Sequence, residues 1–139
     1  MEEEDTMIDL SYAKQQFDAF LDEFDREDDK IKLKIVHTYA VVDAAHEIAL
    51  RMGLKQEELY LAELIALLHD IGKIGVPVEI INKPARLTDE EYEIIKTHPV
   101  IGANILKEIT EIPDISIGAR YHHERYDGKG YPDHLKGQD

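Results

Sequence analysis

The stretch HHERYDGKGYP, from His122 to Pro132, places two adjacent imidazoles and two carboxylates just before a turn built from Gly and Pro. Far upstream, the pair His69-Asp70 closes an apolar run. Imidazole and carboxylate are ligands for borderline divalent metals, and helical proteins commonly collect such ligands from several helices. The two stretches therefore predict one metal site assembled from distant parts of a helical chain.

The composition is typical of one domain with a hydrophobic core. The chain has 139 residues, 43% of them hydrophobic, and no cysteine. The absence of cysteine excludes disulfides and thiolate metal ligands. It also fits a reducing cytoplasm, where we expect this protein. No direct membrane insertion is expected, because no apolar run approaches the roughly 18 residues of a membrane span.

The net charge of −14 is concentrated near the N-terminus. Residues 1–29 hold twelve of the thirty acidic residues and two of the sixteen basic ones. A solvated helix face accounts for this acidity. No basic stripe is present, and neutralising many phosphates requires one. Binding to a nucleic acid polymer is therefore disfavoured, whereas a small anionic ligand can still bind beside metal cations.

Hydrophobic periodicity predicts an all-α fold. We expect an amphipathic helix over about 8–25 that carries Phe17, Phe20 and Phe24, and then a charged linker over 26–30. Thr88 and Glu91 predict a capping box. The further helices are expected over about 31–52, 57–71, 88–97, 99–109 and 115–124, with a structured loop over 73–87. Two parts follow: 1–30, an acidic helix with its linker, and 31–139, the metal-binding domain.

His37 is expected to point inward, and His46 to lie on the opposite side of the same helix in a structural or surface role. The residues that share the His37 face at helical spacing are Leu33, Val41, Ala44, Ile48 and Met52. A lone inward histidine is more often a hydrogen-bonded core residue than a ligand.

His69 and Asp70 end a buried helix, where an unpaired carboxylate is costly. A metal pair bridged by Asp70 solves this problem, and a simple His–Asp hydrogen bond is the alternative. Lys73, one turn later, is expected at the rim of the site, with a plain surface lysine as the alternative.

The remaining histidines differ in what they indicate. His98 precedes Pro99 at a helix junction and is either a ligand or part of a plain cap. His122 and His123 point about 100° apart on a regular helix, so one metal cannot easily take both from such a helix, whereas two neighbouring metals could take one each. His134 has no evident partner in the sequence.

These residues resemble a known family. His37 and the stretch HDIGKIGVP (69–77) resemble the HD superfamily of metal-dependent phosphohydrolases. The stretch HHERYDGKGYP and the segment 82–106 resemble its HD-GYP branch, whose members hydrolyse cyclic di-GMP. The resemblance covers roughly residues 31–139. It implies an HD-domain helical bundle with a metal site between helices.

The resemblance also implies roles for particular residues. Lys73 matches a lysine that holds the substrate phosphate. A loop matches one that shapes the site and docks GGDEF-type cyclase domains, and it contains Asp127, Gly128, Gly130, Tyr131 and Pro132. Of these residues, Asp127, Gly130 and Tyr131 are expected to bind substrate. The implied metal ligands are His37, His69, Asp70, His98, His122 and His123. Two divalent ions are expected, iron or manganese first, although zinc and nickel suit the same ligands.

The expected reaction is hydrolysis of cyclic di-GMP to linear pGpG by a hydroxide between the metals, with GMP left open as a further product. Asp70 is expected to bridge the ions, and Lys73 to stabilise developing charge. The ligands divide into His69 and His37 on one ion and His98, His122 and His123 on the other.

The chain also departs from the family pattern. Leu33 stands where members with three metals have a glutamate, which favours two metals. The chain ends at Gln138-Asp139, before the helices that carry a last aspartate ligand and nucleotide-contacting basic residues, and residues 8–68 look more like stand-alone HD hydrolases. A C-terminally incomplete, self-associating domain is therefore expected, because uncovered apolar faces usually find a partner.

Three alternatives stay open. The chain can be a non-catalytic cyclic di-GMP sensor or cyclase-docking module, which the missing aspartate favours. It can be a generic HD phosphohydrolase of other nucleotides, which the N-terminal half favours. A helical scaffold with surface histidines is the least favoured, because it leaves the His69-Asp70 and His122-His123 pairs unexplained.

Overall fold

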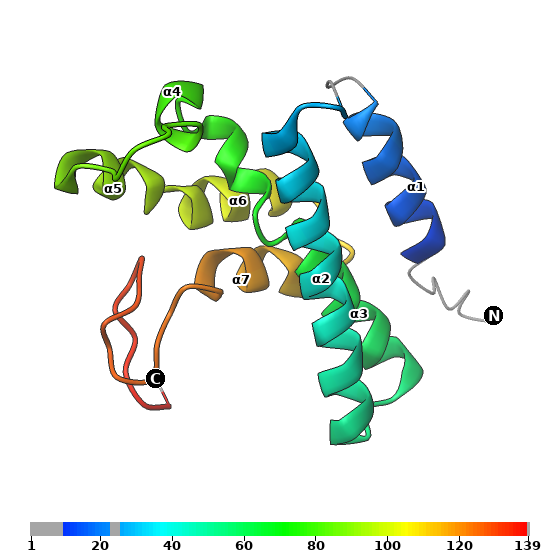
Figure 1. Ribbon diagram of the computed structural model, residues 1–139. Helices are drawn as coiled ribbons and strands as arrows, with labels where there is room; N and C mark the ends of the chain where they lie inside the picture. Colours follow the sequence, from blue (N-terminus) through cyan, green and yellow to red (C-terminus); the bar gives the residue numbers. More distant parts are fainter. Residues whose placement is uncertain (1–9, 23–25, 139) are drawn as a thin grey trace. The chain divides into compact units, whose positions relative to one another are not determined.

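The computed structural model describes residues 10–22 and 26–138. Residues 8–9 and 23–25 of the helix predicted over 8–25, Phe24 among them, lie outside the described residues, as does the side chain of Phe20. All the secondary-structure elements of the described part are helices, which confirms the all-α prediction. No helix in those ranges is long and apolar enough to cross a membrane. The chain forms two compact units, residues 1–67 and 68–139, and each is described by itself (Figure 1).

The first unit is built from three helices: α1 (Leu10–Leu21), α2 (Asp29–Met52) and α3 (Gln56–Leu68). Its apolar interior draws on all three helices, which supplies the burial that stabilises the unit. The buried apolar residues are Leu10, Leu21, Val42, Ala49, Leu59, Leu64, Ala66 and Leu67.

Tyr39 joins α2 to α1. Its ring meets that of Phe17 edge-on, with centroids 6.1 Å apart. The Tyr39 hydroxyl donates a hydrogen bond of 3.0 Å to Asp18 Oδ1. Burial, and then the Asp18 carboxylate, raise the pKa of Tyr39, so the phenol keeps the proton that it donates.

Glu63 is a buried carboxylate on α3, with 7% of its surface exposed. The Lys14 ammonium lies 3.8 Å from Glu63 Oε1, and His46 Nδ1 lies 3.3 Å from the same oxygen. A buried charge needs such partners. His46 thus has a structural contact within the first unit, in keeping with the role expected for it.

The prediction that His37 points inward is wrong. His37 is exposed, and its neighbours on the same face are exposed too: Leu33 by 70%, Ile48 by 59% and Met52 by 68%. Helix α2 instead buries a second apolar stripe at helical spacing, on which Val42 and Ala49 are almost fully covered. The helix has apolar residues on more than one face, so periodicity alone could not select the buried one.

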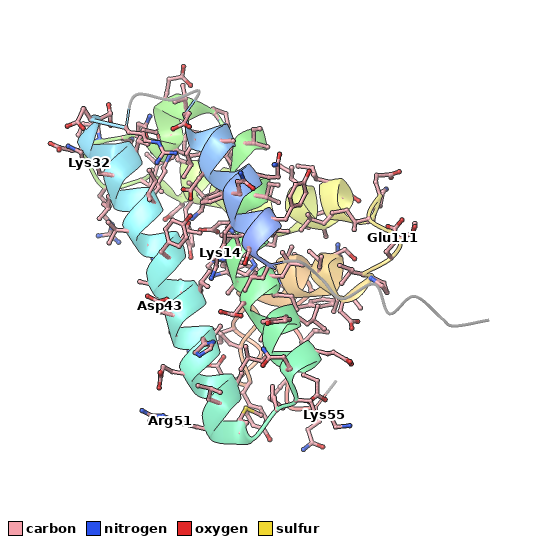
Figure 2. The ribbon with its side chains drawn as sticks, turned by 90° about the vertical axis from the view of Figure 1, so that its right-hand side faces the viewer. Lys14, Lys32, Asp43, Arg51, Lys55 and Glu111 are labelled. Atoms are coloured by element: carbon pink, nitrogen blue, oxygen red, sulfur yellow. The ribbon has the colours of Figure 1, made fainter. Side chains whose placement is uncertain are left out.

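Charged residues border α2 and the turn that follows it. The side chains of Lys32, Asp43 and Arg51 extend from the helix into solvent, and Lys55 does so after the turn at Gly53 (Figure 2). Gly53 has φ +70°, a left-handed conformation that other residues rarely adopt. The helix therefore ends at Met52, where the sequence predicts.

The second unit contains a 3₁₀ helix, η1 (Ile71–Gly75), and four α-helices: α4 (Val78–Ile81), α5 (Asp89–Ile95), α6 (His98–Leu106) and α7 (Asp114–Tyr121). Helix α6 packs against both α7 and η1. The buried residues of this unit are Val76, His98, Pro99, Leu106, Ile115 and Ala119, together with His69 and the glycines Gly72, Gly102 and Gly130. A histidine within this core is the first sign of a site.

Several helix boundaries differ from the predictions. Helix α3 ends at Leu68 and is followed by η1, and the predicted loop 73–87 contains the short α4. The capping box at α5 is confirmed: Thr88 Oγ1 accepts from the Glu91 amide, and Glu91 Oε2 accepts from the Thr88 amide. Helix α7 was expected to reach residue 124 but ends at Tyr121, because the following backbone turns back to bond with the terminal loop.

Candidate metal centre and adjoining pocket

Two glycines bring the loop that carries Asp70 against the start of α6. A Cβ built on Gly72 would overlap the His98 carbonyl group, and one built on Gly102 would lie 3.1 Å from the Gly72 nitrogen. Only residues without side chains allow the two backbones to approach this closely. Asp70 precedes η1 and His98 opens α6, so this contact places their side chains together.

His98 and His122 are held in the same way by backbone carbonyls. The Nδ1 atom of His98 lies 2.7 Å from the Ile95 carbonyl oxygen, and that of His122 lies 2.8 Å from the Ala119 oxygen. A carbonyl only accepts, so each Nδ1 carries the proton and donates it. In the neutral imidazoles each Nε2 then carries a lone pair. This is the arrangement in which histidines ligate metals.

The carboxylate of Asp70 faces imidazoles with both oxygens. Its Oδ1 lies 3.3 Å from His98 Nε2 and 3.5 Å from His122 Nε2. Its Oδ2 lies 3.4 Å from His69 Nε2 and 2.5 Å from the Lys73 ammonium. Oδ1 thus faces His98 and His122, and Oδ2 faces His69 and Lys73. A carboxylate so placed is suited to bridging two ions.

Asp70 is strongly biased toward its charged form. Burial by itself disfavours the carboxylate, but the His122, His69, His98 and Lys73 side chains outweigh burial and hold the pKa of Asp70 well below its usual range. The acid is therefore ionised at any physiological pH. It offers a permanent negative charge at the centre of the cluster, which attracts a cation.

The distances between the donor atoms suit ligands of a shared metal ion better than they suit hydrogen bonds among the donor atoms themselves. His98 Nε2 lies 3.2 Å from His122 Nε2, although both Nδ1 atoms hold the ring protons. Asp70 Oδ1 is buried and has no hydrogen-bond partner among the described residues. Metal bonds of about 2.0–2.2 Å at angles of about 90–110° separate ligand atoms by about 3.0–3.5 Å. A shared cation would satisfy all three atoms.

His123 completes this group. Asp70, His98, His122 and His123 each offer one ligand atom, and all of these atoms lie within 4.8 Å of one another. Its ring stacks on that of Tyr131, with centroids 4.6 Å apart and an angle of 18° between the planes. Burial, followed by His122 and His98, lowers the pKa of His123 to about 4. The imidazole is thus neutral at pH 7, as a ligand must be.

Both consecutive histidines reach the cluster because they lie beyond the last residue of α7. The His122 and His123 ring centroids are 4.2 Å apart, with an angle of 44° between the planes. On a continuing helix the two rings would diverge. The difficulty of one metal taking both histidines rested on a continuing helix, and α7 ends at Tyr121.

Glu124 fastens the terminal loop to the end of α7. Its carboxylate accepts backbone hydrogen bonds from Asp133 (2.6 Å), His134 (3.0 Å) and Leu135 (3.0 Å). Gly130 fits beneath this connection, since a Cβ there would lie 2.5 Å from both the His123 oxygen and the Glu124 Cα. The predicted site residue Gly130 therefore permits a close backbone approach.

Asp127, also predicted to bind substrate, is exposed and engaged within its own turn. Its carboxylate accepts from the Arg125 guanidinium at 3.0 and 2.6 Å and from the Lys129 amide at 3.0 Å. The Arg125 guanidinium and then the Lys129 amide lower the pKa of Asp127. Gly128, with φ +74°, closes the turn. The geometry gives Asp127 a role in shaping the loop.

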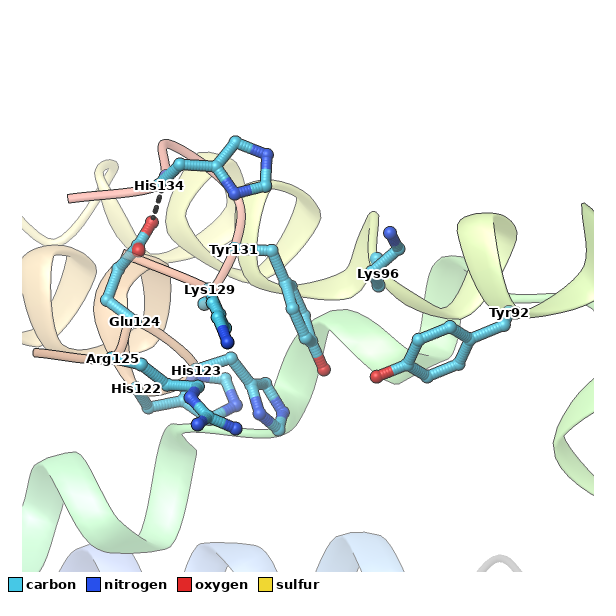
Figure 3. A pocket seen from close by; sticks show the side chains of 10 residues that line it. Tyr92, Lys96, His122, His123, Glu124, Arg125, Lys129, Tyr131 and His134 are labelled. Carbon is cyan, nitrogen blue, oxygen red and sulfur yellow. Dashed lines mark hydrogen bonds between the residues drawn. The ribbon is translucent and has the colours of Figure 1, made fainter. Parts of the chain in front are cut away.

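A pocket of about 410 Å³ adjoins the histidines. Figure 3 shows the Tyr92 hydroxyl directed toward that of Tyr131, with the ring of Tyr131 next to His123. Burial, and then Tyr92, raise the pKa of Tyr131 to about 12. Sequence reasoning missed five of the lining residues: Tyr92, Lys96, Arg125, Lys129 and His134. Tyr92 and Lys96 are four residues apart on a helix, a spacing that could have indicated a shared face.

His37 belongs to α2 in the first unit, whereas the other predicted ligands belong to the second unit. Its role as a ligand, with His69 as its companion, stays a prediction.

A family model described as HD domain matches residues 23–139. The chain belongs to the HD domain family. This confirms the resemblance that the motifs indicated. HD-domain phosphohydrolases are metal-dependent, and the Asp/His cluster of this HD domain agrees with that property.

The HD domain is similar to several curated proteins. It is 44% identical over 94 residues to the cyclic di-GMP phosphodiesterase response regulator RpfG of Xanthomonas campestris, covering 66% of this chain and 25% of that protein. It is 45% identical over 103 residues to a cyclic di-GMP phosphodiesterase of Thermotoga maritima, covering 72% and 28%. It is 34% identical over 110 residues to 3'3'-cGAMP-specific phosphodiesterase 1 of Vibrio cholerae, covering 79% and 26%. The chain thus spans about a quarter of the length of these relatives.

Proposed function

We propose that this protein is a metal-dependent phosphodiesterase that hydrolyses cyclic di-GMP to linear pGpG. The observation that carries the proposal is the convergence of His98 Nε2, His122 Nε2 and the unpartnered Asp70 Oδ1. Relatives named cyclic di-GMP phosphodiesterases support the substrate. GMP as a further product stays open.

The proposed ligands divide between two divalent ions, iron or manganese. Asp70 would contribute to holding both ions. His98, His122 and His123 would hold one ion, and His69 and His37 would hold the other. When bound, such ions lower the pKa of water and neutralise phosphate oxygens, which a phosphodiester requires because its charge repels a nucleophile.

The protein's own groups orient the substrate and balance its charge. The Lys73 ammonium lies beside Asp70, so a phosphate at the cluster has a cationic donor within reach. The His98 and His122 imidazoles are held by backbone carbonyls, which keeps their Nε2 atoms pointed into the cluster without a reorganisation step. Tyr131 and Gly130 shape the wall of the adjoining pocket, where the nucleoside part binds.

The experiment compares the wild type with Asp70→Asn, which keeps the shape and removes the charge. Protein purified without chelators or a His-tag is assayed for metal by elemental analysis and for cyclic di-GMP hydrolysis with Mn²⁺ or Fe²⁺. Asp70→Asn should lose metal and turnover. His46→Gln is the control, because His46 contacts Glu63 in the first unit. An Asp70→Asn protein with full metal content and turnover would end the proposal.

The substrate panel should contain 3'3'-cGAMP and other nucleotides, because some relatives are named for 3'3'-cGAMP. A preference for 3'3'-cGAMP would redirect the substrate and keep the chemistry. Tight binding of cyclic di-GMP without turnover would instead favour the sensor alternative. Docking of a GGDEF-type cyclase on the loop 128–132 is a further proposal, supported by the neighbouring Tyr126, which is 78% exposed.

A further inference from the structure

The pocket beside the metal cluster carries more positive charge than the scissile phosphate needs. Beyond the histidines it is lined by Lys96, which caps the C-terminal end of α5, and by Arg125 and Lys129 from the terminal loop. Its one lining carboxylate, Glu124, already accepts three backbone N–H groups. The remaining surface of the pocket is therefore suited to an anion.

Lys96 is held in place on the pocket wall. Its ammonium lies 5.4 Å from the centre of the Tyr92 ring, and the side chain is 23% exposed. Its carboxylate partner, Glu93, is 68% exposed. An ion pair with so exposed a partner contributes little, so an incoming phosphate can compete for the ammonium.

Lys129 stands across the pocket from α5. Its backbone amide donates to Asp127, and Asp127 also binds the Arg125 guanidinium. Among the residues that the structure describes, no ion pair involves the Lys129 ammonium. Figure 3 shows Lys129 and Lys96 on opposite sides of the Tyr131 ring in that view. The loop thus fixes the backbone of Lys129 and leaves its ammonium for a ligand.

Tyr92 and Tyr131 form an aromatic surface between these cations. One face of the Tyr131 ring is covered by His123, and Tyr92 meets Tyr131 nearly at right angles, with ring centroids 6.5 Å apart. Tyr92 is 47% exposed and also lines a second cavity of about 320 Å³. A half-exposed tyrosine ring is a stacking partner for a nucleobase.

The geometry points to a second substrate subsite, in which Lys96 and Lys129 bind the phosphate that is not being cleaved and Tyr92 stacks on the neighbouring base. The inference rests on the proposed function, since a cyclic dinucleotide has two phosphates and the metals hold one. A pocket of about 410 Å³ lies within the usual size range for small-molecule sites. Selection of cyclic dinucleotides over simple phosphodiesters is assigned to these three residues.

The test measures selectivity. Wild type and variants are assayed on cyclic di-GMP and on bis(p-nitrophenyl) phosphate, which has one phosphate and no base. The ratio of the two kcat/KM values should fall about 10-fold or more in Lys96→Ala and in Lys129→Ala, mainly through a higher KM for the dinucleotide. Tyr92→Ala should lower it similarly, and Tyr92→Phe should restore most of the loss. Lys107→Ala, on an exposed site outside the pocket, is the control.

Titration calorimetry with cyclic di-GMP gives a readout that does not require turnover, and the same variants should weaken binding about 10-fold. Thermal melts check that each variant folds. Unchanged selectivity and unchanged dinucleotide binding in all three variants would overturn the subsite and leave the proposed function standing. Equal losses on both substrates would also overturn it, because the residues would then act on the scissile phosphate. A wild type that neither binds nor hydrolyses either compound would remove the proposed function itself.

Discussion

The backbone at Gly72 lies against the carbonyl group of His98, so closely that no side chain fits between them. Gly72 belongs to the 3₁₀ helix that follows Asp70, and His98 is the first residue of α6. The contact therefore sets the separation between the central carboxylate and a buried imidazole. Because Gly72 carries only a hydrogen atom where other residues carry Cβ, the two backbones can approach closely enough for the ligand cluster to form.

Gly72→Ala should disrupt this contact. We expect a loss of about 1–3 kcal/mol in the free energy of unfolding, measured with urea, because overpacking displaces backbone. Metal content should fall as well. Gly53→Ala is the control: it has φ +70° and nothing within 4 Å of an added Cβ, so it strains the turn and leaves metal content unchanged. Full metal occupancy in Gly72→Ala would contradict this view of the contact.

Glu124→Gln should loosen the terminal loop. The substitution removes the charge that strengthens three backbone hydrogen bonds, and we expect a loss of about 1–3 kcal/mol in the free energy of unfolding. Hydrogen exchange at the amides of Asp133, His134 and Leu135 should accelerate. Glu111→Gln, at an exposed site, is the matched control. If those amides keep wild-type protection in Glu124→Gln, the carboxylate does not hold the loop.

The stability of the metal-free protein should depend on His123. Burial and the neighbouring imidazoles lower the pKa of His123 to about 4, whereas an ordinary imidazole titrates near pH 6.5. As the pH falls from about 6.5 to about 4, His123 binds a proton in the unfolded chain but not in the folded chain. The free energy of unfolding therefore decreases over this range and loses this dependence below it. The ring is partly exposed, so the effect is modest.

Urea titrations in the presence of a chelator, at several pH values from about 4 to about 7, test this dependence. His123→Gln removes the titrating group and should flatten the pH profile. Identical profiles for the wild type and His123→Gln would show that the pKa of His123 is not lowered in the folded protein.

His37→Ala tests the predicted division of ligands between two ions. Metal content should fall from about two ions per chain to about one, because Asp70, His98, His122 and His123 remain to hold the other. Elemental analysis of dialysed protein gives the count, with His46→Ala as control. An unchanged metal count in His37→Ala would remove His37 from the ligand set.

Self-association is expected through the exposed apolar face of α2. Leu33, Ile48 and Met52 are each more than half exposed on it, and such faces usually find a partner. Light scattering should give a mass above the 16.0 kDa of one chain. Leu33→Glu should shift the mass toward the monomer, whereas Asp43→Lys, an exposed polar position of the same helix, should not. A monomer at high protein concentration would contradict the prediction.

Local signals in the sequence predicted local structure well. The capping box of Thr88 and Glu91, the end of α2 at Gly53 and the helical class of the chain all follow from interactions within a few residues. The prediction that His37 points inward was wrong because it depends on more than interactions within a few residues. Helix α2 has apolar residues on more than one face, and the choice among faces depends on what packs against the helix.

The residues that line the pocket could not be predicted from local signals in the sequence. Tyr92 and Lys96 lie in a helix that shows no metal or phosphate motif, and they line the site only because the terminal loop folds back beside α5. That return depends on Glu124, whose carboxylate bonds to amides nine to eleven residues away. Contacts over such distances leave no periodic pattern in a sequence.

The sequence alone determined which side chains this protein can offer to a metal, because imidazoles and carboxylates have lone pairs that bind metals whatever their position in the chain. Tertiary structure decided which of them meet. Asp70, His98 and His122 converge because two glycines allow backbones to touch and two carbonyls orient the rings. His123 joins them because α7 ends before it, where the backbone turns back to bond with the terminal loop.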